Sequence, residues 1–329
     1  MSDLPLAKAH RVDDLEPIFI GGVVRSGTTL LGSVLGRSPG CVCPPEARFL
    51  AEFLENVQSP DANSIEEAER FLDYVSAHWR FRAWNIDPTV PDVNVLLKAS
   101  SSPAETMRRI VEIYAREHGH NEVYRWIDHT PWNLRYASVL RQAFPRSRFV
   151  HIIRDPRGFY ASISKLPWGP NAPLPGADLW LAQIGACLAA EEYLEDAILR
   201  VRYEDLLENP VETLKGLCDF LQIEYVEEML SGGGFDVPRY TLEQHALVAR
   251  PLDSSRVRAW ESELNRRDVE IIETHLGTTL EHLGYSKVSP RPRRPARNRE
   301  RLLGAFRDFI LRFVINPPRN RWRRRLLEK

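Results

Sequence analysis

The chain of 329 residues lacks the features that mark membrane-spanning and secreted proteins. It has no apolar stretch approaching the roughly 18–20 residues that a membrane-spanning helix needs. Its first residues, MSDLPLAKAHRVDDLE, contain no apolar core, so a secretory signal is not expected. These two absences predict a cytoplasmic protein.

Cysteine is also scarce, with four residues in the whole chain: Cys41, Cys43, Cys187 and Cys218. Without an export signal, we expect them to be reduced thiols. Only Cys41 and Cys43 lie close together in sequence, and no second pair of Cys or His stands at the spacing of a zinc site. The sequence therefore predicts no metal cofactor.

A net charge of −1 conceals an uneven distribution. Residues 287–329 hold 15 of the 44 Lys and Arg but only 3 of the 45 Asp and Glu, a net charge of +12. The rest of the chain carries a net charge of −13. Because the basic excess belongs to a C-terminal segment and not to the fold, nucleic acid is not expected as a partner.

One lysine is missing from a loop that otherwise resembles a nucleotide-binding motif. Residues 18–31 read IFIGGVVRSGTTLL, in which Gly22, Gly27 and Thr29 fit the pattern G-x-x-x-x-G-K-[ST]. The position of the lysine holds Thr28. Such a strand, loop and helix can direct backbone N–H groups at an anion, and Arg25 adds a fork of charged donors. A tight turn with a surface arginine is the plainer interpretation.

The missing lysine bears on the kind of ligand. In ATP-using enzymes of this pattern, that lysine reaches the terminal phosphates. Its absence weighs against a kinase.

Short apolar strands alternate with helices along the chain. This order predicts an α/β fold, a three-layer sandwich whose central, mostly parallel sheet is covered by helices on both faces. Ligands of such sheets lie beyond the carboxyl ends of the strands. The strands are expected at Ile18–Ile20, Tyr124–Asp128, Arg148–Arg154 and Ile198–Tyr203.

Helices are expected between these strands. Capping boxes at Ser64 and Ser102 predict two helix starts. The run Pro167–Pro175 predicts a mobile loop that could gate an acceptor. The other expected helices are Thr28–Leu35, Asn133–Phe144, Gly158–Lys165, Leu179–Ala197, Pro210–Leu221, 254–265 and 266–284.

A second strand-to-helix junction reads Arg154-Asp-Pro-Arg-Gly-Phe-Tyr-Ala-Ser162. Arg154 ends the strand and Ser162 lies in the following helix, where a second phosphate could be held. Alone, this stretch also fits an ordinary turn with an aspartate at the helix start.

Taken together, the two junctions resemble the sulfotransferase superfamily, which uses 3′-phosphoadenosine-5′-phosphosulfate (PAPS). The family pattern [KR]-x-G-T-T is matched by residues 25–29, and its arginine followed eight residues later by a serine is matched by Arg154 and Ser162. Phe144-Pro145 precedes the strand of the second junction, as in the family pattern. Residues 202–206, Arg-Tyr-Glu-Asp-Leu, are similar to a later family segment. The motifs stand in the family's order over roughly residues 17–285.

The resemblance implies a PAPS-dependent sulfotransferase that needs no metal, with a P-loop-like strand, loop and helix for the phosphosulfate. It assigns binding of the 5′-phosphosulfate to Arg25, Ser26, Gly27, Thr28 and Thr29. Arg25 would also act in catalysis by neutralising the leaving phosphate.

The remaining donor contacts implied by the family lie later in the chain. Arg154 and Ser162 would hold the 3′-phosphate, and Tyr203 would lie near the nucleotide. Arg256, in a basic segment before Trp260, would close over the nucleotide. A solvated helix face explains Arg256 equally well.

Two residues are candidates for the general base. Glu46 in Cys43-Pro-Pro-Glu-Ala-Arg48 matches the E-x-R arrangement of the protein-tyrosine branch, and the heparan N-sulfating branch also carries a glutamate in this region. His129 stands where many relatives have lysine, in Asp128-His-Thr-Pro131. Imidazole can accept a proton or, when charged, stabilise the transferring group. A solvated glutamate and a packed histidine are the plainer alternatives.

The predicted domains are a lead-in at residues 1–16, a sulfotransferase domain at 17–286 and a basic linker with an amphipathic helix at 287–329. In that helix Leu302, Leu303, Phe306, Phe309, Ile310 and Phe313 fall at helical spacing. We expect this apolar face to pack on the domain. The alternative is membrane-surface contact through residues 299–329, at the inner membrane surface, or contact with another protein.

The sequence leaves the acceptor open: a hydroxyl of a small molecule, glycan or peptide, or less favourably an amine. Two rival functions also stay open. One is a divergent P-loop small-molecule kinase, which requires ATP and Mg²⁺. The other is a non-catalytic, membrane-associated scaffold that keeps the fold. The oligomeric state is not predicted.

Overall fold

The computed structural model describes residues 15–57, 64–87, 89–120, 122–235, 237, 248, 250–290 and 292–316. Most of the predicted lead-in and the last arginine-rich residues, 317–329, lie outside the described residues.

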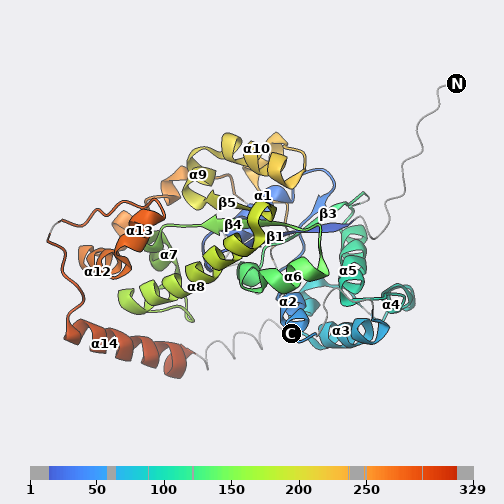
Figure 1. Cartoon of the computed structure of the whole chain (residues 1–329), viewed down its shortest axis with the longest axis horizontal. Helices are drawn as coiled ribbons and strands as arrows, with labels where there is room; N and C mark the ends of the chain where they lie inside the picture. Colours follow the sequence, from blue (N-terminus) through green and yellow to red (C-terminus); the bar gives the residue numbers. More distant parts are fainter. Residues whose placement is uncertain are drawn as a thin grey trace.

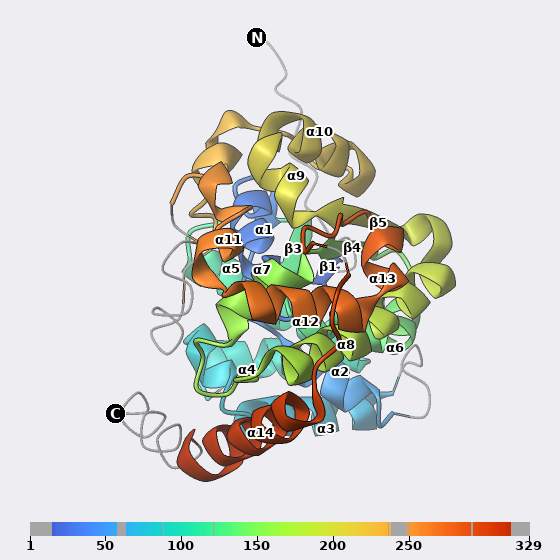
Figure 2. The same cartoon turned by 90° about the vertical axis from the view of Figure 1, so that its left-hand side faces the viewer.

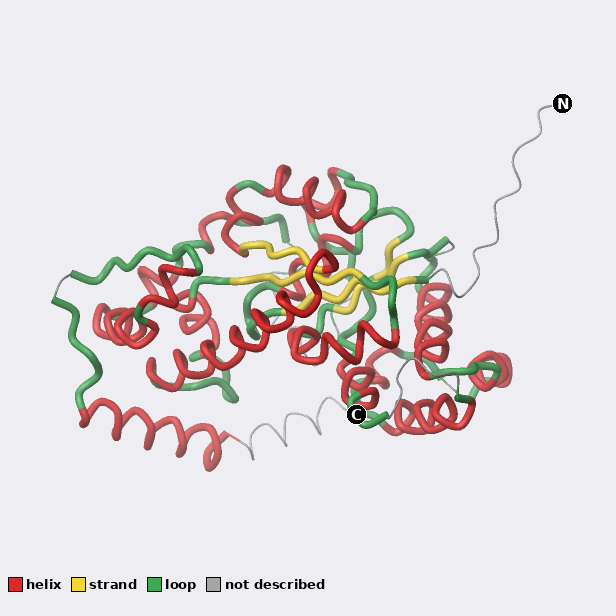
Figure 3. Tube along the Cα trace, in the orientation of Figure 1, coloured by secondary structure: helices red, strands yellow, loops and turns green. Residues whose placement is uncertain are grey.

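Five parallel strands form one sheet, in the order β2-β3-β1-β4-β5. This confirms the predicted parallel sheet, which Figure 3 shows in yellow at the centre of the molecule. The strands are β1 (Glu16–Gly21), β2 (Cys41–Val42), β3 (Arg125–Asp128), β4 (Arg148–Ile153) and β5 (Ile198–Arg202).

Alternating side chains along the strands build two apolar layers, one on each face of the sheet. Ile18 and Ile20 of β1 join one cluster of buried residues, and Phe19 between them joins the other. Since successive side chains of a strand point to opposite faces, both faces must be covered. Helices α1, α9 and α10 cover the first face, and α2, α5, α6 and α8 cover the second (Figure 1). The predicted three-layer α/β sandwich is therefore confirmed.

Fourteen α-helices lie in the described part of the chain. They are α1 (Thr28–Leu35), α2 (Arg48–Leu54), α3 (Ile65–Ala77), α4 (Pro91–Lys98), α5 (Pro103–Glu117), α6 (Ala137–Ala143), α7 (Pro156–Ile163), α8 (Pro173–Leu194), α9 (Tyr203–Glu208), α10 (Pro210–Leu221), α11 (Trp260–Glu263), α12 (Arg266–Leu276), α13 (Thr278–His282) and α14 (Asn298–Phe309).

Short 3₁₀-helices and one π-helical segment complete the architecture. Those with three residues per turn are η2 (Phe81–Trp84), η3 (Pro131–Tyr136), η4 (Glu195–Ala197), η5 (Glu227–Ser231) and η7 (Ser254–Arg256). A π-helical segment, η8 (Ile310–Ile315), continues α14.

Both predicted capping boxes begin helices. Ser64 accepts a hydrogen bond from Glu67 N at 3.2 Å, and Ser102 accepts one from Glu105 N at 3.2 Å. Pro103 occupies the first turn of α5, where its missing N–H costs nothing.

Three predicted elements differ from the structure. The predicted loop Pro167–Pro175 ends early, because Pro173 begins α8. Proline is favoured in a first helical turn, so proline alone does not indicate a loop there. The expected helix at 266–284 is divided into α12 and α13 at Gly277, whose φ is +56°. The expected helix at 254–265 is reduced to η7 and α11.

The carboxyl ends of all five strands meet at one edge of the sheet, because the strands are parallel. The loop at residues 22–27 follows β1, Arg154 follows β4, and Tyr203 follows β5. Glu46 follows β2 by a few residues. The fold therefore brings together the residues that the two junction motifs contribute.

Candidate functional site

The loop between β1 and α1 has a tightly fixed backbone. Arg25 has a φ of +66° and Gly27 a φ of +102°, both in the left-handed region. Gly27 is required there, since a Cβ atom would lie 2.7 Å from Cδ2 of Tyr203. Gly22 N donates to the Pro131 carbonyl at 3.0 Å, and Val24 N donates to Gln183 Oε1 at 2.9 Å. The loop is thus pinned from two other segments.

The N-terminus of α1 is built to receive an anion. Its N-cap is Gly27, which has no side chain to accept hydrogen bonds from the first turn. Those N–H groups have no partner within a helix, and the helix dipole adds positive potential. Ser26 is fully buried, and its Oγ has no hydrogen-bond partner among the described residues. Thr28 and Thr29 are buried in the first turn.

The two junction motifs meet at Arg25. Its Nε donates to Ser162 Oγ at 3.3 Å, and its carbonyl accepts from Arg154 Nη1 at 2.8 Å. The Arg154 guanidinium also lies 4.3 Å from the centre of the Tyr203 ring. The structure therefore brings the predicted residues Arg25, Arg154, Ser162 and Tyr203 together.

Glu46 lies at the same edge of the sheet and is held by an arginine. Its Oε2 accepts from Arg80 Nη1 at 3.0 Å, and the two side chains are 21% and 20% exposed. Burial raises the pKa of the Glu46 carboxyl, while the charges of Arg80, Arg48 and Arg25 lower it. Glu46 is thus a partly buried carboxylate in basic surroundings, a setting suited to proton transfer.

His129 is fully buried and packs away from solvent. Its ring lies edge-on to Phe235 at 4.7 Å, and a Cβ atom on Gly32 of α1 would lie 2.9 Å from its own Cβ. Burial lowers the pKa of His129 to about 4, although Asp128 raises it in part. The ring is therefore neutral at pH 7 and enclosed by α1 and Phe235. Its predicted catalytic role stays a prediction.

Arg256 lies in η7 and forms an ion pair with Glu263 at 3.9 Å. Its side chain is 38% exposed. The segment η7 packs beside α9, the helix that Tyr203 begins. The predicted contact of Arg256 with a nucleotide stays a prediction.

Two residues of the site were missed from the sequence. Arg80 follows α3 in the segment His78-Trp79-Arg80, far from any motif, and nothing in its spacing points to Glu46. Gln183 lies in the middle of α8, where a polar residue is ordinary. Only the folded chain places these two side chains against Glu46 and the phosphate loop.

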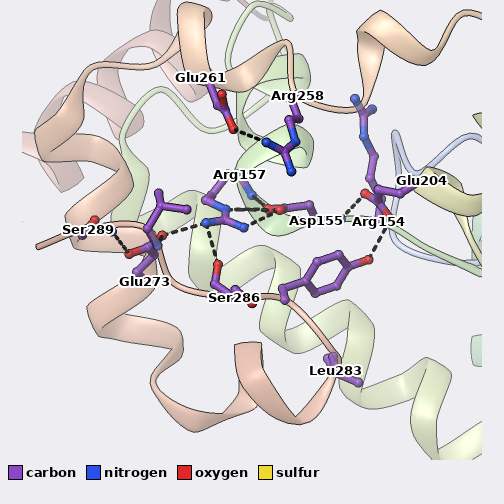
Figure 4. Close-up of polar contacts among 12 residues, drawn as sticks. Arg154, Asp155, Arg157, Glu204, Arg258, Glu261, Glu273, Leu283, Ser286 and Ser289 are labelled. Atoms are coloured by element: carbon purple, nitrogen blue, oxygen red, sulfur yellow. Dashed lines mark hydrogen bonds and ion pairs between the residues drawn. The ribbon is translucent and has the colours of Figure 1, made fainter. Parts of the chain in front are cut away.

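Directly after Arg154 in the chain, a buried ion network connects the second junction to helix α12 (Figure 4). We call Asp155, Arg157 and Glu273 the closed network. Arg157 Nη2 pairs with Asp155 Oδ2 at 2.6 Å and Arg157 Nη1 with Glu273 Oε1 at 2.7 Å. The Ser286 carbonyl accepts from Arg157, while Val288 N and Ser289 N donate to Glu273. Each charge in this network has a partner of opposite sign.

No group of three or more His, Cys, Asp or Glu side chains that could hold a metal ion occurs in the part of the chain that the structure describes.

Comparison with protein families gives a match to the Sulfotransferase family over residues 17–228, which is more than half of the chain. Curated relatives include protein-tyrosine sulfotransferase A of Caenorhabditis elegans, 25% identical over 286 residues that span 82% of this chain and 67% of the relative. Protein-tyrosine sulfotransferase 2 of Gallus gallus is 24% identical and spans 84% of this chain and 71% of the relative.

Solved structures share the fold. The sulfotransferase domain from the curacin biosynthetic pathway aligns with a TM-score of 0.57 at 19% identity, over 83% of this chain and 99% of that domain. The sulfotransferase domain from the Synechococcus PCC 7002 olefin synthase gives a TM-score of 0.53 at 23% identity, over 80% and 95% of the two chains. The predicted family resemblance and fold are confirmed.

The predicted cytoplasmic location is wrong on this comparison. The curated relatives are animal protein-tyrosine sulfotransferases, and similarity to them gives no support for a cytoplasmic protein or for the inner face of a membrane. Within the described residues, no helix combines the length and apolar character needed to cross a bilayer.

Proposed function

The chain belongs to the sulfotransferase family, and we propose that it transfers a sulfuryl group from PAPS to a hydroxyl group, leaving adenosine 3′,5′-bisphosphate. The observation that carries this proposal is the meeting of two anion-binding junctions at Arg25. Arg25 contacts Ser162, and Arg154 contacts the Arg25 carbonyl, so two phosphate positions would lie side by side.

The residues present fit such a donor. The uncapped start of α1 and the buried, unpartnered Ser26 hydroxyl offer hydrogen bonds to one anionic group. Arg154 and Ser162 offer a charged fork and a hydroxyl to a second group. We assign the 5′-phosphosulfate to the first set and the 3′-phosphate to the second.

Bound PAPS supplies an activated sulfuryl group with a phosphate as its leaving group. In the transfer, the acceptor oxygen bonds to sulfur while the bond from sulfur to the phosphate oxygen breaks, and that oxygen keeps the electron pair. Arg25 and the N–H groups of α1 stabilise the charge that develops there. As in phosphoryl transfer, alignment and charge stabilisation would supply most of the rate.

Glu46 is the residue we propose as the base that takes the acceptor's proton. Its side chain is 21% exposed, and its carboxylate lies close enough to Arg25 for the two charges to interact. His129 is enclosed in the core, so the hydroxyl of a large acceptor would not reach it in this conformation.

The acceptor we favour is a phenolic hydroxyl on a polypeptide. Two of the relatives described above are protein-tyrosine sulfotransferases, which motivates the choice. Near Glu46, the guanidinium of Arg80 lies 4.7 Å from the ring centre of Trp79, and that of Arg48 lies 5.5 Å from the ring centre of Trp132. Aromatic side chains of this kind could stack on a phenol ring.

The donor can be tested by isothermal titration with adenosine 3′,5′-bisphosphate, using ATP with Mg²⁺ as the control. We expect the bisphosphate to bind and ATP not to bind. Binding of ATP with Mg²⁺ alone would favour a small-molecule kinase, and binding of neither would favour a non-catalytic scaffold of the same fold.

The acceptor can be tested in the same preparation with PAPS carrying radioactive sulfur. A tyrosine-containing peptide and the same peptide with phenylalanine in place of tyrosine form a matched pair. Label on the first peptide alone would support the phenolic acceptor. If simple phenols or sugars are labelled and neither peptide is, the acceptor assignment is wrong although the donor assignment stands.

A further inference from the structure

Helix α14 lies at the edge of the molecule, after the family match has ended. Figures 1 and 2 both show it at the periphery, below α8 and α12. Its large apolar side chains face outward. We define the α14 ridge as Leu302, Leu303, Phe306, Phe309 and Phe313, which are 72%, 64%, 65%, 56% and 58% exposed.

This orientation overturns the expectation that the apolar face packs on the domain. The side that faces α8 is instead small or polar. Asp308 is buried and its Oδ1 accepts from Asn171 N at 2.7 Å. A Cβ atom on Gly304 would lie 3.1 Å from the Ala172 Cβ, so the helix approaches closely there.

The helix is fastened at both ends. At its start, the two guanidinium nitrogens Nε and Nη2 of Arg267 donate to the Glu300 carboxylate at 2.9 and 2.7 Å. Beyond its end, Asn316 Nδ2 donates to the Pro167 carbonyl. These contacts all lie on the side of Gly304 and Asp308 or at the two ends, and the large apolar side chains on the other side stay exposed. Contiguous, solvent-exposed apolar side chains of this kind indicate a site of interaction.

We propose that the α14 ridge docks on a membrane surface that carries anionic lipids. Arg299, Arg301 and Arg307 are exposed on the same helix, and residues 287–329 carry a net charge of +12. A helix that combines large apolar side chains with flanking arginines can lie in the interface between headgroups and acyl chains, where both kinds of side chain are satisfied.

Two other occupants fit the surface less well. A second copy placed ridge to ridge would bring two segments of net charge +12 together, and like charges repel. A partner protein would have to offer both an apolar groove for the ridge and acidic side chains for the flanking arginines, and an anionic bilayer supplies both. Here Gly304 and Asp308 are already covered by the domain, so only one side is available. A flat lipid interface needs only that side.

The proposal can be tested by sedimenting the full chain with phosphatidylcholine vesicles that contain or lack phosphatidylserine. We expect the protein to sediment with the anionic vesicles and stay in solution with the neutral ones. The double variant Phe306→Asp/Phe309→Asp should lower the bound fraction by at least about 10-fold, because it removes two rings from the interface and adds charges that the lipid repels.

A matched control is Tyr193→Asp, which places the same charge on an aromatic residue that is 54% exposed on α8. It should sediment like the unaltered chain. The charge-reversed double variant Arg301→Glu/Arg307→Glu should also sediment much less with the anionic vesicles. Since all these side chains are exposed, the variants should keep the circular dichroism and the bisphosphate affinity of the unaltered chain.

Three results would overturn the proposal. The first is equal sedimentation of the Phe306→Asp/Phe309→Asp variant and the unaltered chain. The second is equal sedimentation with neutral and anionic vesicles. The third is a dimer in analytical ultracentrifugation that the same double variant disrupts, since a second copy would then cover the ridge.

Discussion

Two clusters of charge draw residues from the junction between β4 and α7, and they differ in the balance of positive and negative charge. In the first, Arg80 and Arg25 act on a single carboxylate, Glu46, and Arg154 donates to the Arg25 carbonyl; we call these four residues the loop cluster. The second is the closed network, in which Arg157 has two buried carboxylate partners.

Arg154 and Arg157 show the contrast most directly, since they stand three positions apart in one motif. Arg154 donates to a carbonyl and lies over Tyr203, and among the described residues no carboxylate forms an ion pair with it. Arg157 is 4% exposed and also lies 4.2 Å from the Trp260 ring centre. Removing one partner from a buried network of paired charges destabilises the fold, whereas an excess of positive charge favours a bound anion.

The largest effect should come from removing the one carboxylate of the loop cluster. Glu46→Gln should lower turnover by about 10²–10⁴-fold, the range typical of a general base, and leave bisphosphate affinity nearly unchanged. Single-turnover transfer and titration calorimetry on the same preparation measure the two quantities. Turnover close to that of the unaltered chain would remove Glu46 from this role.

Breaking the closed network should act on folding. Arg157→Ala should lower the free energy of unfolding by about 3–5 kcal/mol, because it leaves the buried Asp155 without its counter-charge and Glu273 with Arg293 alone, at 3.6 Å. Denaturant unfolding followed by circular dichroism measures this change. A loss below about 1 kcal/mol, the range of an exposed pair, would show that the network is not needed for stability.

Arg154→Ala should weaken ligand binding and change the stability of the fold little, unlike Arg157→Ala. Affinity for adenosine 3′,5′-bisphosphate should fall roughly 10- to 100-fold, the value of one charge-assisted hydrogen bond, while the free energy of unfolding changes by about 1 kcal/mol. Calorimetry and denaturant unfolding compare this variant with Arg157→Ala. Unchanged affinity would refute the assignment of Arg154 to the 3′-phosphate.

The smallest effect that we expect is a shift in the pH dependence of kcat/KM when Arg80, the ion-pair partner of Glu46, is replaced. Burial raises the pKa of Glu46 and Arg80 lowers it, so Arg80→Ala should raise that pKa further. A base is active when deprotonated, and the acidic limb of the profile of kcat/KM against pH should therefore move to higher pH. Arg82→Ala, in the same segment but exposed, is the matched control. An acidic limb that stays in place in Arg80→Ala would show that the ion pair does not tune Glu46.

Much of the loop cluster could be predicted from the sequence, because its residues belong to contiguous motifs. Arg25 and Arg154 each follow a recognisable strand, and parallel strands bring their carboxyl ends to one edge. Arg80 could not be found in this way. It reaches Glu46 from a helical segment between β2 and β3, and the direction of that segment depends on packing that no local pattern encodes.

The closed network and the α14 ridge were beyond prediction for related reasons. Arg157 and Glu273 lie 116 positions apart, and an arginine in R-D-P-R looks the same whether it binds a ligand or a carboxylate. In α14, periodicity revealed an apolar face but not its direction. Gly304 and Asp308, which look incidental in the sequence, decide which side meets the domain.

The distance in sequence between Arg157 and Glu273 affects the order in which the closed network can form while the chain is being translated. When a ribosome has made the strands and the phosphate loop, Glu273 is still to come, 116 residues after Arg157. Val288 and Ser289, whose N–H groups bind Glu273, emerge later still. The family match ends at residue 228, so a nascent chain can contain both junction motifs, and the Arg157–Asp155 pair, before Glu273 is made. The junction that carries Arg154 should therefore gain its last buried ion pair, between Arg157 and Glu273, only in the last stage of translation.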